Sequence, residues 1–198
     1  MQMNIIKKLA IFTDTENNEQ RAYIRIIDGI SISINTFDSN NNATGYMNIY
    51  FHPNNRLYLD NIYCYDQFRN KGIATFISEL SDYILKDYDG YIIRGSYEPG
   101  QLSTDRENNI ERSQEELEKA ARKFYKKNGY EIINYEEYNK NKDKFPYIID
   151  GDFYLGEADP ATIVVKQLHE YEYTFYEEDG ILYHNKYDRS YTKKINRH

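Results

Sequence analysis

Residues 67–74 have the composition of a phosphate-binding turn. The alternating apolar run before them, residues 57–64, predicts a strand, and the amphipathic run after them, residues 73–85, predicts a helix. In such a turn, backbone N–H groups converge on one point and the helix dipole adds partial positive charge there. Gly72 would let an anion approach the backbone, because glycine has no Cβ. The alternative is an ordinary tight turn that binds nothing.

A second segment, residues 113–130, predicts a helix that ends at a glycine and leads into a strand. Ser113 and Glu116 have the spacing of a capping box. Apolar side chains follow at helical intervals, and Asn128-Gly129 favours a left-handed exit from the helix. Taken by itself, this pattern is that of any amphipathic helix with a glycine stop.

The elements around these two segments are mostly strands. Five of them are expected before residue 66, at residues 5–12, 21–27, 30–37, 43–52 and 56–65. Further strands are expected at residues 91–94, 130–135 and 162–168, and a hairpin at residues 171–177 and 181–187. Asp28-Gly29 and Asp179-Gly180 are strong hairpin signals. Residues 98–112 read as a long polar loop, and residues 139–160 as irregular.

The length of 198 residues suits a single domain, residues 1–198. We place its core at about residues 21–168, a hairpin extension at residues 169–187 and a frayed tail at residues 188–198. The 22 tyrosines, with no tryptophan, suit half-buried sheet surfaces.

Charge and composition exclude several classes of protein. The net charge of −7 argues against a nucleic-acid binder, because phosphate attraction needs clustered Lys and Arg, and favours cationic partners. No apolar run approaches the roughly 18 residues of a membrane span, so no membrane association is expected. The single cysteine, Cys64, excludes an internal disulfide and suits a reducing, cytoplasmic location.

Together the two segments resemble the GNAT superfamily of N-acetyltransferases. The first matches the pattern Arg/Gln-x-x-Gly-x-Gly/Ala at Arg69, Gly72 and Ala74. The second matches Ala-x-x-Phe/Leu-Tyr-x-x-x-Gly-Phe/Tyr at Ala121, Phe124, Tyr125, Gly129 and Tyr130. The element order of residues 43–168 is also that of the family core. The resemblance implies an α+β fold with a mixed, mostly antiparallel sheet, a splayed strand pair and flanking helices, plus the C-terminal β-hairpin.

Two features depart from the family pattern. The two helices that usually follow the family's first strand are not evident, and the short polar segment of residues 13–20 stands in their place. Many members have Asn three residues before the motif alanine, where this chain has Glu118. Glu118 would change one contact to the cofactor. Without the two helices, which often wall the acceptor site in the family, acceptor binding cannot be copied from the family pattern.

The resemblance implies transfer of an acetyl group from acetyl-CoA to an amine by direct attack in a ternary complex. The cofactor pyrophosphate would be held at Arg69, Asn70, Lys71, Gly72, Ile73 and Ala74. The main-chain N–H of Cys64 would polarise the thioester carbonyl, and Tyr125 would act as general acid and contact the cofactor. The strands at residues 57–65 and 91–97 would form the splayed pair. A nucleophilic Cys64 would need a nearby His or cation, and the sequence names none.

The general base is open. Asp60 shares its strand face with Ile62 and Cys64 by period two, which makes it the best-placed carboxylate, but a strand-edge or salt-bridged aspartate is an equal alternative. A water chain and Glu98 are further options. The four histidines show no metal-ligand spacing.

The acceptor would be an amine on a small molecule or a protein. The loops at residues 98–112 and 139–160 would frame its entrance, and the hairpin at residues 171–187 would either cover that entrance or form a homodimer contact. Glu118 and the missing helices favour an alternative, an acyl-CoA-binding or protein-interaction module with weak or no catalysis. A third hypothesis is a tyrosine-rich β-protein with no relation to acetyl-CoA.

Overall fold

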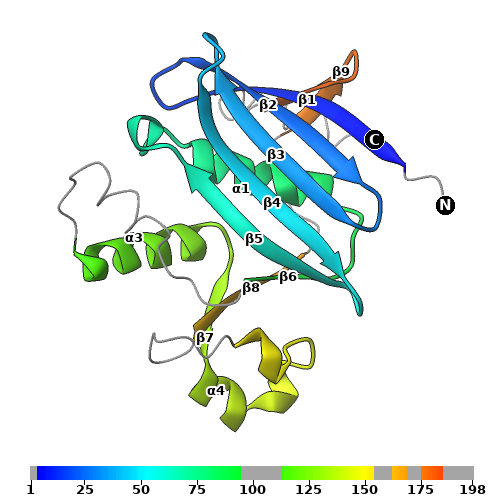
Figure 1. Ribbon diagram of the computed structural model, residues 1–198, viewed down its shortest axis with the longest axis vertical. Helices are drawn as coiled ribbons and strands as arrows, with labels where there is room; N and C mark the ends of the chain where they lie inside the picture. The colour runs from blue at the N-terminus through cyan, green and yellow to red at the C-terminus, as the bar shows by residue number, and fades with distance from the viewer. Residues whose placement is uncertain (1–3, 95–112, 154–161, 169–174, 185–198) are drawn as a thin grey trace, which may run out of the picture. The chain divides into compact units, whose positions relative to one another are not determined.

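The computed structural model describes residues 4–94, 113–153, 162–168 and 175–184, which form two compact units (Figure 1). The first unit comprises Met1–Phe51, Leu59–Tyr88 and His169–His198, and the second comprises His52–Tyr58 and Asp89–Leu168. Several sequence predictions lie outside the described residues: the end of the second splayed strand, Glu98, the loop at residues 98–112 and the tail at residues 188–198.

The first unit is built on a sheet with the strand order β5, β4, β3, β2, β1, β10, β9. These strands are β1 (Ile5–Thr13), β2 (Glu19–Ile27), β3 (Ser31–Asp38), β4 (Ala43–His52), β5 (Arg56–Cys64), β9 (Phe175–Glu178) and β10 (Ile181–His184). β1 to β4 are paired antiparallel, as the alternating pattern predicted. The expected hairpin at Asp28-Gly29 is confirmed, with Gly29 at a φ of +66° and a hydrogen bond from Ile30 N to Ile27 O of 2.9 Å.

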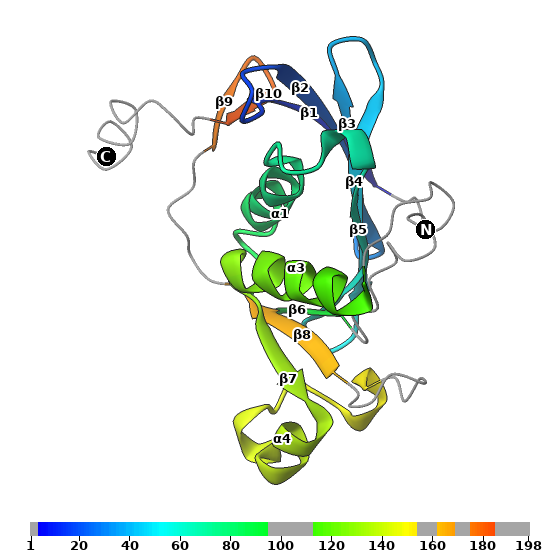
Figure 2. The ribbon, with the colours of Figure 1, turned by 90° about the vertical axis from the view of Figure 1, so that its left-hand side faces the viewer.

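Helix α1 (Ile73–Ile84) covers one face of this sheet (Figure 2). Its apolar stripe, Ile73, Phe76, Ile77 and Leu80, is at most 2% exposed and packs with the inward side chains of the strands. At Gly45 of β4 the packing leaves no room for a side chain, because a Cβ there would lie 2.7 Å from the Tyr63 carbonyl oxygen and 3.2 Å from Ile77 Cδ1. β4, β5 and α1 therefore meet in direct contact at Gly45.

The C-terminal hairpin extends this sheet. β10 pairs in parallel with β1, and β9 pairs antiparallel with β10. The His184 side chain, 3% exposed, lies 3.0 Å from the Glu79 carboxylate of α1, and Lys8 of β1 forms an ion pair of 3.1 Å with Glu177. The turn at Asp179-Gly180 is the expected one, whereas the parallel pairing with β1 has no signal in the hairpin's own sequence.

The second unit contains the strand order β7, β8, β6, with β6 beside the start of β5. Its elements are β6 (Tyr91–Arg94), α3 (Gln114–Lys127), β7 (Glu131–Asn134), α4 (Tyr135–Lys140) and β8 (Thr162–Gln167). β6 is parallel to β5, and the pairing covers three residues of β5, Arg56 to Tyr58. β8 is antiparallel to both β6 and β7. The mixed, mostly antiparallel α+β fold is therefore confirmed.

The segment after β7 corrects the sequence prediction. We expected a strand through residue 135 and an irregular chain from residue 139, but α4 begins at Tyr135 and is followed by 3₁₀ turns at Lys142–Lys144 and Asp150–Asp152. The Asn134 side chain caps α4 by accepting a 2.8 Å hydrogen bond from Glu137 N. Tyr138 of α4 is buried against Ile133, Ile148 and Phe153, which explains why this polar stretch folds.

No helix among the described residues is long and apolar enough to cross a membrane.

Candidate functional site

The turn between β5 and α1 has the backbone geometry that binds anions. β5 leads into a short 3₁₀ turn, Asp66–Phe68, and then into Gly72, which is the N-cap of α1. Gly72 has a φ of +82° and Asn70 a φ of +62°, so two left-handed residues flank Lys71. Alternation of this kind turns successive N–H groups to the same side and forms an anion-binding concavity at a helix N-terminus.

The N–H groups of this turn have no protein partner within residues 4–94. The backbone hydrogen bonds recorded there include none donated by residues 70–74, whereas the preceding N–H of Arg69 donates to Asp66 O and the following N–H of Phe76 donates to Gly72 O. Buried or half-buried N–H groups are normally paired, so an unpaired run at a helix start favours a ligand or solvent at that position.

The short connection between β1 and β2 packs against this turn. Thr15 N donates a 3.1 Å hydrogen bond to Lys71 O, and a Cβ on Gly72 would lie 3.3 Å from Thr15 Cγ2. The Asp14 carboxylate, 3% exposed, holds the connection by accepting hydrogen bonds of 2.9 Å from the N–H groups of Glu16 and Asn18. The short segment of residues 13–20 therefore supports the turn, a role that its polar composition did not predict.

Both cations expected at the turn are already paired with carboxylates. Arg69 forms an ion pair with Asp66, and Lys71 Nζ lies 2.7 Å from Glu16 Oε2. The hydrogen bond to Glu16 raises the pKa of Lys71, so this amine stays protonated. An anionic ligand would therefore meet main-chain N–H donors at this turn, because both side-chain cations are already paired with carboxylates.

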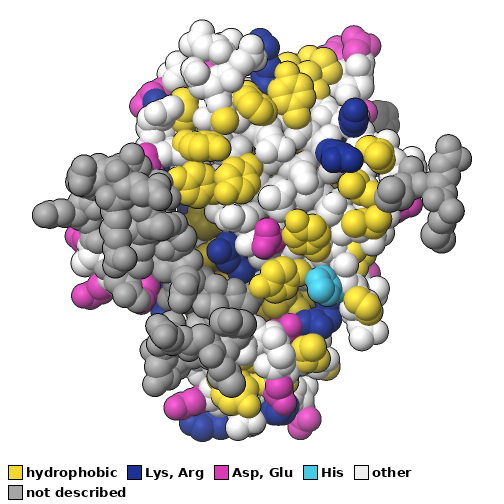
Figure 3. Space-filling view, in the orientation of Figure 1, with side chains coloured by type: hydrophobic (Ala, Val, Ile, Leu, Met, Phe, Trp, Pro, Cys, Tyr) yellow, Lys and Arg dark blue, Asp and Glu magenta, His cyan; other side chains and the backbone are white. Residues whose placement is uncertain are grey.

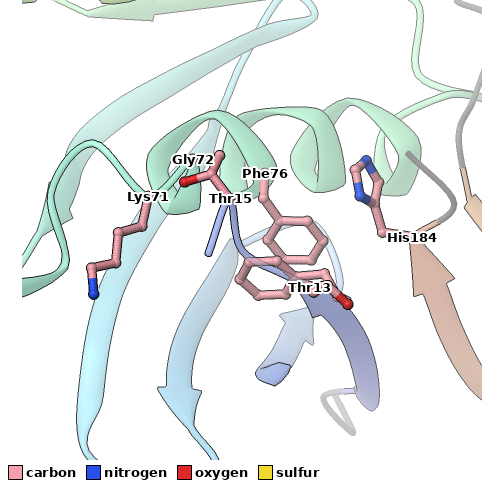
Figure 4. A pocket seen from close by; sticks show the side chains of 7 residues that line it. Thr13, Thr15, Lys71, Gly72, Phe76 and His184 are labelled. Carbon is pink, nitrogen blue, oxygen red and sulfur yellow. The ribbon is translucent and has the colours of Figure 1, made fainter. Parts of the chain in front are cut away.

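A small pocket opens beside the turn (Figure 4). It is lined by Phe12, Thr13, Thr15, Lys71, Gly72, Phe76 and His184. The rings of Phe12 and Phe76 are stacked with centroids 3.5 Å apart, and the His184 ring meets Phe76 edge-on at 5.4 Å. The described residues contain no group of three or more His, Cys, Asp or Glu side chains that could hold a metal ion.

Cys64 lies at the end of β5 with a thiol that resists ionisation. Its Sγ donates a hydrogen bond of 3.3 Å to Phe68 O, and burial raises the pKa of the thiol to about 11 although the nearby Arg69 charge lowers it. Only a thiolate is strongly nucleophilic, so the geometry favours a role for the Cys64 main chain over a role for its side chain.

We therefore expect Cys64 to react slowly with iodoacetamide. At pH 8 a thiol with a pKa of about 11 is on the order of 0.1% ionised, against roughly a quarter for an unperturbed cysteine, and the alkylation rate should keep rising as pH approaches 11. Mass spectrometry of the timed reaction at several pH values measures this, with the urea-unfolded chain as the control. A rate that levels off near pH 8 would contradict the buried, protonated thiol.

Tyr125 lies in the second unit, on α3, where it is 4% exposed. Its ring contacts Tyr130 edge-on at 5.3 Å. Burial raises the pKa of the Tyr125 phenol, while Arg94 of β6 lowers it through its charge and a hydrogen bond to the side chain. The phenol is thus protonated at neutral pH, and the Arg94 guanidinium would stabilise the phenolate if the phenol lost its proton. Sequence reasoning missed Arg94, although it ends the strand that was placed at residues 91–94.

The structure distributes the predicted site residues over the two units. Cys64, Asp60 and residues 69–74 belong to the first unit, where the chain brings Cys64 and the turn together through Phe68. Tyr125 and Arg94 belong to the second unit, as does Glu118, which is half-buried on α3. Asp60 is exposed, and its charge adds to the effect of burial, which raises the pKa of Tyr46 on the neighbouring strand.

Comparison with known proteins gives matches among solved structures alone. No family model matches the sequence, and no curated protein matches it. A GNAT-family acetyltransferase from Staphylococcus aureus MU50 is 14% identical over 71% of this chain and 70% of its own, with a TM-score of 0.46. An aminoglycoside 6'-N-acetyltransferase solved with coenzyme A is 14% identical over 73% of this chain and 76% of its own, with a TM-score of 0.46. Nourseothricin acetyltransferase is 11% identical over 83% and 87%, with a TM-score of 0.43. In fold, the chain is similar to acetyltransferases of the GNAT superfamily, the family that its two motifs resemble.

Proposed function

We propose that the protein is an N-acetyltransferase that transfers an acetyl group from acetyl-CoA to an amine by direct attack in a ternary complex. The observation that carries this proposal is the turn of residues 70–74, whose N–H groups lack partners among the described residues of the first unit. A diphosphate is an anion of the right chemistry for such a turn, and the helix dipole of α1 adds to the attraction.

Each residue has a defined task in this reaction. Residues 70–74 bind the diphosphate through main-chain N–H groups, with Arg69 and Lys71 adding positive charge at its edge. Anchoring the remote nucleotide orients the thioester, so binding free energy is converted into rate. The main-chain N–H of Cys64 donates to the thioester carbonyl oxygen and stabilises its developing negative charge.

Two proton transfers complete the step. The amine nitrogen forms a bond to the carbonyl carbon, the carbon–sulfur bond breaks, and the departing thiolate takes a proton from the Tyr125 hydroxyl. Arg94 then stabilises the Tyr125 phenolate until it is reprotonated. The ammonium gives one proton to solvent before attack, because a protonated amine has no lone pair, and the nitrogen gives a second proton to Asp60, directly or through water, as the carbon–nitrogen bond forms.

A binding module that retains acyl-CoA affinity but has weak or no catalysis is the second candidate. The pairing of Lys71 with Glu16 and of Arg69 with Asp66 favours it, because both cations are engaged before any ligand arrives. Glu118 at the position of a cofactor-contacting Asn favours it as well. For either function we place the protein in the cytoplasm, without nucleic-acid or membrane partners, and leave a homodimer open to measurement.

Ligand-dependent unfolding followed by product analysis tests these proposals in order. Acetyl-CoA at about 100 times its Kd should stabilise the folded protein by about 2.7 kcal/mol, and S-acetylpantetheine, which lacks the diphosphate and the nucleotide, should not at the same concentration. Mass spectrometry of amine mixtures incubated with labelled acetyl-CoA then looks for a labelled product. Stabilisation without product in any mixture supports the binding module, and no stabilisation contradicts both candidates.

A further inference from the structure

Three tyrosines form a cluster on the first unit beside Cys64. The ring centroids of Tyr63 and Tyr65 are 5.2 Å apart with perpendicular planes, and Tyr46 of β4 lies 5.5 Å from Tyr63 and 6.4 Å from Tyr65. Tyr63 and Tyr65 are the immediate chain neighbours of Cys64. Two of the three tyrosines are therefore adjacent in the chain to the main-chain group to which the thioester is assigned.

The cluster is held in place and remains open to solvent. Asn61 Nδ2 donates a hydrogen bond of 3.3 Å to the Tyr46 hydroxyl, which fixes that ring. Tyr65 is 39% exposed, and Tyr46 and Tyr63 are partly buried. Apolar side chains gather on the sheet face that α1 leaves uncovered, and some of them surround charged groups (Figure 3). Three rings in mutual contact with different tilts offer π faces in more than one direction.

A carboxylate accompanies the three rings. Asp60 is exposed and directly precedes Asn61, whose side chain donates to the Tyr46 hydroxyl, so a solvent-accessible carboxylate lies next to the cluster along β5. Aromatic faces beside a carboxylate attract a cation twice, through the ring quadrupole and through charge. The net charge of −7 adds attraction at long range. An anionic or neutral partner would gain neither contribution.

We propose that Tyr46, Tyr63, Tyr65 and Asp60 bind an ammonium group of an aliphatic diamine or polyamine acceptor. The role of this site in catalysis rests on the proposed function. One ammonium held at the cluster would direct a second, deprotonated amine of the same molecule toward the thioester carbonyl beside Cys64. The cluster thus selects acceptors that carry at least two amines over monoamines of equal length. Asp60 then serves substrate binding in addition to, or in place of, proton removal.

Calorimetric titration of the full chain with 1,4-diaminobutane, in the absence of acetyl-CoA, tests the binding site directly. The matched neutral probe is 1,4-butanediol, which should not bind. Tyr65→Leu should weaken diamine binding about 3- to 30-fold, the range of a cation–π contact, and Asp60→Asn about fivefold. Asp60→Glu should restore most of the affinity. Both positions are exposed, so circular dichroism should show folded variants.

Tyr23→Leu is the matched control. Tyr23 is 49% exposed on β2 of the same sheet and meets Phe37 edge-on at 5.6 Å, so the change removes an equally accessible aromatic ring from a different pair. Diamine affinity that is unaltered in both Tyr65→Leu and Asp60→Asn, or lowered equally in Tyr23→Leu, would overturn the assignment, as would equal binding of the diol. Diamine binding with the expected variant effects but no acetylated product would leave the ammonium site standing and refute the acetyltransferase.

Discussion

Gly72→Val is expected to weaken acetyl-CoA binding by at least about tenfold. A β-branched residue is strained at a φ of +82°, since left-handed backbone costs an L-residue roughly 1–2 kcal/mol, and a Cβ would press on Thr15 Cγ2 at 3.3 Å. The turn would relax by changing its dihedrals, and the N–H groups of residues 70–74 would no longer converge. Calorimetric titration with acetyl-CoA measures the loss of affinity.

Gly180→Val separates the loss of the turn from general strain. Gly180 has a φ of +78°, close to that of Gly72, and a Cβ there would meet nothing within 4 Å. This variant should lose a similar amount of stability in urea unfolding while its affinity for acetyl-CoA stays the same. If the Gly72→Val variant and the unchanged protein bind acetyl-CoA with equal affinity, the assignment of the diphosphate to this turn is wrong.

Tyr125→Phe is expected to lower kcat by about 10²- to 10³-fold and to leave the Kd for acetyl-CoA within about twofold, because general acid catalysis contributes in this range and the phenol acts on the leaving group. Burial raises the pKa of Tyr125, so the acid is in its active, protonated form at neutral pH and ionises only at a pH above that of an ordinary phenol. The alkaline decline that reflects this ionisation should be absent from the variant. Steady-state kinetics against pH provides both values.

Tyr138→Phe is the control for removing a buried phenol oxygen. The Tyr138 hydroxyl donates to Ile148 O at 3.2 Å and has no part in the proposed reaction, so its loss should cost about 1 kcal/mol of stability and leave kcat within about twofold. If Tyr125→Phe and Tyr138→Phe have the same kcat, Tyr125 is a packing residue and not the acid.

Several helices and turns were accessible from the sequence because local rules decide them. The stripe from Ile73 to Leu80 is a helix, the Ser113–Glu116 capping box starts α3, and Asp28-Gly29 makes its hairpin. In each case a short pattern and its own backbone preference agree with the tertiary structure, so the pattern is a sufficient predictor.

The features that were missed depend on long-range contacts. Thr15 and Glu16 meet Lys71 across 55 residues or more, and no local pattern encodes that pairing. Arg94 acquires its importance only from a partner 31 residues later in the chain. α4 is different, because Asn134 with Glu137 three residues later is a local helix-start pattern. It was missed because the residues before it have the pattern of a strand.

The parallel pairing of β10 with β1 constrains how this protein can be made. β1 is synthesised before its neighbour on that side, Ile181–His184, and the whole second unit is synthesised between them. Until Ile181–His184 has been synthesised, β1 has unpaired backbone groups along this edge, and such edges pair with strands of other chains. A chain that stops before residue 181 would keep this unpaired edge, so synthesis through β10 is a condition for avoiding aggregation.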